Sequence, residues 1–341
     1  MVLLNQHRCP ELARLSMAAQ RYVQQSVAPN TRNQYLAKIK NYVQVCQNLQ
    51  LNPSPITQDK LIIYATHLAQ HISHQSIKCH LSAIKYHAQV HGQDTDFTTF
   101  SRLFRLLTGI KRAQAQKFTK PKRIPVTPSL LYSLRNNLFK STIPYDDKLM
   151  LWAAMLTAFF GFLRISEYTS THARSHDPTT TLCCSDITIL SPFAIDIRIK
   201  ASKTDPFRVG TTIRLIRNNS PLCPIMALFN HKRALYHKSG PLFVFHDGRF
   251  LTRRNFAAAL NKIKPPNTKN LSSHSFRIGA ATTAAAAGLP RWLIQALGRW
   301  TSDCYKTYLR VSDHTKNIVS QSLANTMANN STAFDPDNIS N

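Results

Sequence analysis

The chain has 341 residues, 43% of them hydrophobic, which is enough for a buried core and two domains. It carries 43 Lys and Arg against 16 Asp and Glu, a formal net charge of +27. This excess favours a polyanionic partner, above all nucleic acid, over a merely basic ribosomal-type protein, because binding phosphates releases their counterions.

Membrane, export and metal functions find little support in the composition. No apolar run reaches the length of about 18 residues that a membrane span needs, and the apolar patch near the N-terminus is too short for a secretory signal. The seven cysteines have no paired C-x-x-C spacing, which is typical of reduced thiols in an intracellular protein. The set His172, His176, Cys183 and Cys184 fits no common zinc pattern, so neither a metal nor another cofactor is expected.

The N-terminal part predicts a small helical bundle. Residues 1–20 are expected to be a disordered lead-in, and 21–112 form the first domain. Apolar residues recur there with a period of about 3.6. Four helices are expected: Asn30 (as N-cap) to Leu49, Thr57 to Leu68, Ser76 to His91 with Gly92 as the stop, and Thr99 to Arg112.

Residues 113–128 break the helical pattern with three prolines and four Lys or Arg residues. This composition predicts a basic, semi-stiff linker, although a solvated run of charges remains an alternative. A nucleic acid held between the two domains would have this linker as a strap. The candidate phosphate contacts are Arg102, Arg105, Lys117, Lys120, Lys122 and Arg123.

The second domain, 129–327, is expected to be mostly helical with one small antiparallel sheet, followed by a disordered tail at 328–341. A very apolar helix is predicted over Asp147–Phe159. Strands are predicted over Asp186–Leu190, Ala194–Lys200 and Arg208–Ile216, the last two joined by the polar turn ASKTDPF. Further helices are expected over Cys223–His237, Arg253–Ile263, Phe276–Ala287, Arg291–Leu297 and Ser302–Leu309.

Several residues of this domain have the chemistry to bind or cleave a phosphodiester. Arg164, at the end of the apolar helix, needs an anion or a buried carboxylate; a structural pair with Glu167 is an equal alternative. His274 and Arg277 are helical neighbours at i and i+3, a pairing that suits a phosphoryl group. Lys203 lies at the hairpin tip, where it could protonate a leaving oxygen or be a solvated turn lysine.

Trp300 and a tyrosine complete the set. A phenol is a poor nucleophile unless cations surround it. Tyr308 and Tyr305, one helical turn earlier, are the two candidate nucleophiles.

The ordered set R-x-x-E, hairpin K, H-x-x-R, W and Y resembles the tyrosine recombinase, or phage integrase, family over about Arg164 to Arg310. The resemblance implies that Arg164 and Arg277 clamp the phosphate, that Lys203 is the general acid and that His274 works in acid–base chemistry. It also implies that Trp300 stands where many members have a second histidine and that Tyr308 is the nucleophile. The N-terminal bundle is similar to the family's SAM-like core-binding domain.

The segments HSFRIGAATTAAAAGLP and GRWTSDCYKTYLR look most like those of recombinases of eukaryotic mobile elements, the Crypton and DIRS-like groups. Two residues depart from the family pattern: Trp300 cannot carry a proton as histidine does, and Glu167 stands where many members have Asp.

The resemblance implies site-specific cleavage and rejoining of DNA through a 3′-phosphotyrosyl intermediate without a metal, for integration or excision of a mobile element. It also implies a nuclear location and a homotetramer on two DNA sites. Residues 313–327 have helical potential and could dock on a neighbouring subunit or on their own domain. The alternatives are a catalytically silent, domesticated DNA-binding protein and a type IB topoisomerase-like activity.

Overall fold

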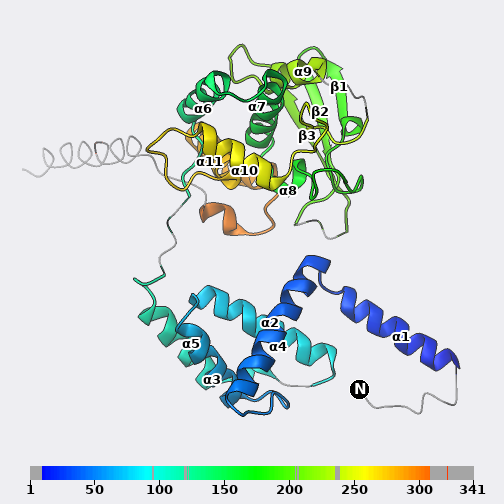
Figure 1. The fold of residues 1–341 in the computed structure, drawn as a ribbon, viewed down its shortest axis with the longest axis vertical. Helices are drawn as coiled ribbons and strands as arrows, with labels where there is room; N and C mark the ends of the chain where they lie inside the picture. Colours follow the sequence, from blue (N-terminus) through cyan, green and yellow to red (C-terminus); the bar gives the residue numbers. More distant parts are fainter. Residues whose placement is uncertain are drawn as a thin grey trace, which may run out of the picture. The chain divides into compact units, whose positions relative to one another are not determined.

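The computed structural model describes residues 10–93, 96–118, 121, 123–203, 205, 207–234, 239–307 and 321. The chain divides into two compact units, Met1–Lys120 and Pro121–Asn341 (Figure 1). The division falls within the segment 113–128, which the sequence predicts as a linker.

The first unit is helical. Thr57 caps α3 (Gln58–Ala69) and Ser73 caps α4 (His74–Val90); their side-chain oxygens accept from the backbone N–H groups of Lys60 and Ser76. Its core contains Leu61, Tyr64, Ile77, Ile84 and Leu103 among others. The helices are α1 (Pro10–Gln25), α2 (Pro29–Asn48), α3 (Gln58–Ala69), α4 (His74–Val90) and α5 (Ser101–Ala113), with the 3₁₀ turn η1 (Phe97–Thr99) before α5.

A buried glutamine fastens the end of α5 to the turn between α3 and α4. The Gln114 side-chain amide donates to the carbonyl oxygens of Ala69 (2.8 Å) and Ile72 (3.0 Å), and its oxygen accepts from the His74 N–H at 2.7 Å. These bonds satisfy backbone groups at two helix ends, so the basic helix α5 is fixed on the bundle.

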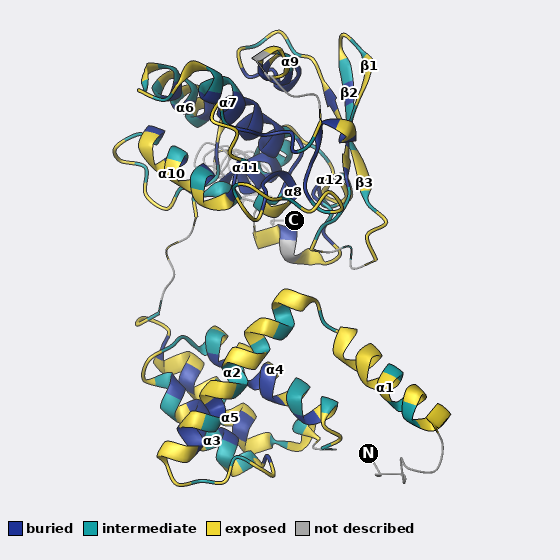
Figure 2. Ribbon diagram, turned by 45° about the vertical axis from the view of Figure 1, so that its right-hand side comes forward, coloured by how far each residue is buried: buried dark blue, intermediate teal, exposed yellow. Residues whose placement is uncertain are grey.

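The second unit is built around the helix α7 (Tyr145–Phe160), in which every residue from Met150 to Phe159 is buried (Figure 2). A helix that is apolar all round requires neighbours on all sides. The other helices are α6 (Pro128–Lys140), α8 (Ile165–Tyr168), α9 (Pro224–Ala234), α10 (Arg253–Ile263), α11 (Ser273–Ala286) and α12 (Arg291–Leu297), with 3₁₀ turns η2 (Cys184–Asp186) and η3 (Asp303–Thr307).

The sheet has three antiparallel strands in the order β1 (Ile187–Ser191), β2 (Ala194–Ile199) and β3 (Thr211–Ile216). Ile195, Ile197 and Ile199 alternate along β2 and are buried, as the period of two requires for an inner face. On the other face, Arg214 of β3 donates two hydrogen bonds to Asp196 of β2, at 2.7 and 2.8 Å.

The segment that enters the second unit is packed against α11. Val126 is completely buried, and its N–H donates to the carbonyl oxygen of Ser275 at 2.9 Å. Gly279, one turn later on α11, allows this approach, because a Cβ there would lie 2.0 Å from the Val126 oxygen. The end of segment 113–128 is thereby held beside the first turn of α11.

The predicted fold class, a helical bundle followed by a mostly helical domain with a small antiparallel sheet, is confirmed. Gly92 follows α4 with a positive φ, as expected of a helix stop.

Some local predictions were wrong. Residue Ala28, not Asn30, is the N-cap of α2, because proline at the first helical position already has a suitable φ and no N–H to satisfy. Residues 10–20 of the expected disordered lead-in belong to the helix α1; the helix is rich in good helix formers, although none of its residues is buried. The helix α6 was not anticipated, and residues 303–307 form a 3₁₀ turn where an α-helix was expected.

Candidate active site

Arg164 follows the buried helix α7 and caps the short helix α8. Its Nη1 donates to Oε1 of Glu167 at 3.0 Å, and its backbone N–H donates to Oε2 at 2.9 Å. The Glu167 side chain is 1% exposed, whereas that of Arg164 is 16% exposed. The ion pair considered as the alternative for Arg164 is therefore present, and the guanidinium still has an edge at the surface.

His274 and Arg277 lie in the first turn of α11, which begins one residue after the capping Ser272. Arg277 is 1% exposed. Its Nη1 donates to the Phe162 carbonyl at 2.5 Å, and its Nη2 donates to the Gly298 carbonyl. These bonds fix the guanidinium plane between the loop that follows α7 and the loop that follows α12.

The electrostatics of His274 show that arginines from distant segments gather around it. The pKa of His274 is lowered to about 4, first by burial and then by the charges of Arg123, Arg277 and Arg164. Coulomb interactions decline with distance, so residues 123, 164 and 277 share one neighbourhood with this imidazole. His274 is therefore neutral at pH 7, and an anion placed among these arginines would be stabilised.

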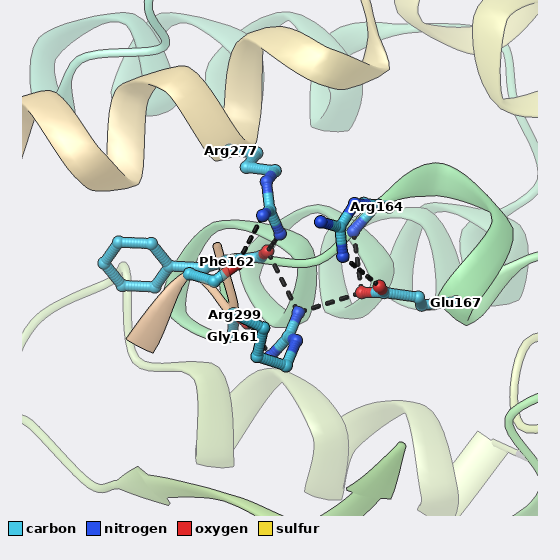
Figure 3. A network of polar contacts seen from close by, with 7 residues as sticks. Gly161, Phe162, Arg164, Glu167, Arg277 and Arg299 are labelled. Carbon is cyan, nitrogen blue, oxygen red and sulfur yellow. Dashed lines mark hydrogen bonds and ion pairs between the residues drawn. The ribbon is translucent and has the colours of Figure 1, made fainter. Parts of the chain in front are cut away.

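A further arginine, Arg299, whose side chain is 9% exposed, lies beside Arg164 and Arg277 (Figure 3). It donates to Oε2 of Glu167 at 2.9 Å and to the carbonyl oxygens of Phe162 and Gly161, both at 3.2 Å. Burial lowers its pKa, although the charge of Glu167 opposes this. Arg299 was not predicted from the sequence. A signal was present in LGRW, because an arginine among apolar residues needs an anion, as Arg164 does.

Trp300 and Tyr305 belong to the core. The Trp300 ring lies 4.3 Å from the Arg277 guanidinium carbon and 6.1 Å from the Tyr305 ring. Trp300 is 6% exposed and Tyr305 is 3% exposed. Trp300 thus supports Arg277 through a cation–π contact. A phenol that is packed in this way has no access to a DNA backbone, which disfavours Tyr305 as the nucleophile.

Two expected catalytic residues are not joined to this group by the described contacts. Lys203 lies in the exposed turn between β2 and β3, where Asp205 accepts from the N–H groups of Val209 and Gly210. Tyr308 lies outside the described residues, as do Lys120, Lys122 and most of the segment 313–327.

The remaining expected DNA contacts have exposed side chains in the first unit, apart from Arg123, which is exposed in the second. Arg102 is paired with Asp59 at 2.9 Å, and Arg105 lies one turn further along α5. Lys117 lies 5.8 Å from the ring centroid of Phe118. All four are accessible to a polyanion.

The described residues contain no group of three or more His, Cys, Asp or Glu side chains arranged to hold a metal ion. In the same part of the chain, no helix combines the length and the apolar character needed to cross a membrane. The five cysteines whose pairing the structure describes are free thiols.

The fold is that of DNA integrases and site-specific recombinases. One similar structure is the XerH site-specific recombinase bound to palindromic difH substrate as a post-cleavage complex (14% identity, TM-score 0.57, 85% of this chain and 78% of that one). Another is the Tn1549 transposon integrase in complex with transposon right-end DNA (12%, 0.57, 87% and 95%). A third is a lambda integrase dimer bound to a COC′ core site (16%, 0.55, 89% and 81%). No protein-family model and no curated protein matches the sequence.

Proposed function

We propose that this chain is a site-specific tyrosine recombinase that cleaves and rejoins double-stranded DNA. The observation that carries the proposal is the gathering of Arg123, Arg164 and Arg277 around His274, within the fold of DNA-bound recombinases and integrases. A scissile phosphate is the ligand whose charge suits this group, since guanidinium groups stabilise the charge that builds on a five-coordinate phosphorus.

In the proposed reaction the Tyr308 oxygen attacks phosphorus, the bond from phosphorus to the 5′-oxygen breaks, and a 3′-phosphotyrosyl link forms. The phenolic proton passes to a base, for which the neutral His274 is the candidate, and Lys203 gives a proton to the leaving 5′-oxygen. A 5′-hydroxyl of a second DNA then reverses these steps. The protein residues perform every step without a metal.

The arginines differ in how they would act. Arg164 keeps an exposed edge and can donate hydrogen bonds to a phosphate oxygen. Arg277, which is bonded to two carbonyl oxygens, would act mainly through its charge, which is weakly screened because the group is buried. Trp300 would hold Arg277 in place and take no part in proton transfer.

The chain would act on a mobile element of the Crypton or DIRS-like type, in the nucleus, as a tetramer on two DNA sites. One similar structure is a lambda integrase tetramer bound to a Holliday junction (14% identity, TM-score 0.55), which supports the tetramer. The exposed residues Arg102, Arg105, Lys117 and Arg123, with Lys120 and Lys122, would contact the DNA backbone.

The test uses nicked suicide duplexes taken from the flanks of the protein's own gene, with EDTA present. We expect a covalent protein–DNA complex that resists SDS, that is lost in Tyr308→Phe and that persists in Tyr305→Phe. Loss of the complex under EDTA, or its survival in Tyr308→Phe, contradicts the proposal. Tight binding without a covalent complex would indicate a silent DNA-binding protein, and relaxation of supercoils at any sequence would indicate a topoisomerase.

A further inference from the structure

Arg299 is the more deeply buried of the two arginines that donate to Glu167. Its side chain is 9% exposed, compared with 16% for Arg164, and three of its hydrogen bonds are made to Glu167, Phe162 and Gly161. A group so placed has little surface to offer a DNA phosphate, so an effect of Arg299 on the reaction would pass through the groups that it contacts.

The network pairs two positive charges, those of Arg164 and Arg299, with the single negative charge of Glu167. Glu167, with a side chain that is 1% exposed, accepts from Arg164 through Oε1 and from Arg299 through Oε2. Arg164 and Glu167 alone would form a neutral pair, whereas the three groups together retain one positive charge. That charge lies at the exposed end of the network because Arg299 is the more deeply buried of the two arginines.

We propose that Arg299 is a positioning residue that orients and neutralises Glu167, so that the charge of Arg164 remains available to the DNA phosphate. This inference rests on the proposed recombinase function. Without Arg299, the carboxylate would be compensated by Arg164 alone, and the attraction of Arg164 for an anion would fall.

The same side chain also ties the two loops that carry the site. Arg299 and Arg277 both donate to the Phe162 carbonyl, so one oxygen connects the arginine of α11 with the loop before Arg164 (Figure 3). Phe162 and Arg299 each have a φ of 52°, in the left-handed region that residues with a Cβ seldom adopt. The hydrogen bonds between these two positions hold both turns in that conformation.

The test compares Arg299→Met, Arg299→Lys and the control Arg249→Met, which removes an exposed arginine that is paired with Asp247. All are assayed well below their melting temperatures, on duplexes with either a phosphate or an uncharged methylphosphonate at the cleavage position. On the phosphate duplex, we expect Arg299→Met to slow covalent-complex formation by roughly 100-fold, the scale of losing one charge-stabilising group. We expect Arg299→Lys to recover at least part of the rate and Arg249→Met to stay within about 2-fold of wild type.

On the methylphosphonate duplex, the loss caused by Arg299→Met should shrink to within about 5-fold, because less charge develops in the transition state. Adding Glu167→Gln to Arg299→Met should raise the rate on phosphate DNA, because it removes the carboxylate that Arg164 must otherwise compensate. Equal losses on both duplexes, or a further loss in the double variant, would show that Arg299 serves only to hold the fold and would overturn the proposal.

A separate measurement applies if wild-type protein forms no covalent complex on any duplex, an outcome that refutes the proposed function. Inorganic phosphate is then titrated while the His274 ring signals are followed by NMR. The positioning role predicts phosphate binding in wild type and in Arg249→Met, weakened at least about 5-fold in Arg299→Met. Equal phosphate affinities, or no response of His274 in wild type, would overturn it.

Discussion

Replacing Gly279 by alanine tests whether the segment before α6 must lie directly on α11. The added Cβ would be 2.0 Å from the Val126 oxygen and 2.8 Å from its carbonyl carbon and nitrogen. These are backbone atoms that cannot rotate away, so α11 and residues 124–127 must separate by about 1 Å before the contact is tolerable. The separation strains the hydrogen bond from Val126 to Ser275 and moves Arg123 relative to His274.

The expected cost follows from two opposing effects. Overpacking of this severity costs about 3 kcal/mol, while alanine in place of glycine within a helix gains about 1 kcal/mol. The net loss of about 2 kcal/mol should lower the melting temperature of the second unit by roughly 4–8 °C. Covalent-complex formation should also slow, because Arg123 is displaced from its position relative to His274.

Tryptophan fluorescence is a selective assay, since Trp152, Trp292 and Trp300 all lie in the second unit. Gly109→Ala is the matched control: its Cβ meets no atom within 4 Å, and it lies on α5 of the first unit. The control should leave the fluorescence transition within about 1 °C of wild type. A melting temperature of Gly279→Ala within the same margin would refute the close packing of Val126 on α11.

Three further predictions concern charge. The pKa of His274 is lowered to about 4, so its NMR titration midpoint should lie near that pH. Between about pH 6.5 and 4 the unfolded chain binds a proton here that the folded chain does not, so the free energy of unfolding should fall as the pH decreases through this range. The fall should be smaller in His274→Gln, which removes the imidazole. The pKa of His246 is raised by its hydrogen bond to Asp147, so the sign is opposite. Its contribution to the free energy of unfolding is complete below about pH 6.5 and is lost as the pH rises through the higher pKa of the folded state. His246→Gln should therefore reduce the loss of stability on the alkaline side, as measured by urea unfolding. Arg105→Ala should reduce the slope of log affinity for DNA against log salt concentration by about 0.9. The control Arg14→Ala, which removes the partner of Glu11, should leave the slope unchanged. Equal slopes for the wild type and both variants would contradict a phosphate contact at Arg105.

The sequence was most informative where local chemistry is repetitive. Helical periodicity predicted α2 to α5. Strand signals, rich in β-branched residues for β2 and β3, predicted the three strands, because each pattern depends only on neighbouring residues. The end of α2 and the stop at Gly92 followed for the same reason. The helix α1 and the N-cap of α2 were predicted wrongly, since both depend on a choice between local conformations that differ little in energy.

The sequence also identified Arg164, Glu167, His274 and Arg277 as residues whose chemistry needs explaining, and it gave both possibilities for Arg164. It could not decide between an ion pair and an anion site, because that depends on which groups from other segments complete the charge. In the structure, Glu167 is shared by two arginines, and the second of these, Arg299, comes from a loop more than a hundred residues away.

Composition and local pattern therefore determined the basic character, the fold class and the candidate residues of this protein. The tertiary structure alone decided which of those residues act on one another. It buried Tyr305 against Trp300, turned Arg277 towards two carbonyl oxygens and lowered the pKa of His274. The reason is physical: electrostatic interactions and burial depend on distances in space and on exclusion of water, and neither is encoded in the spacing of residues along the chain.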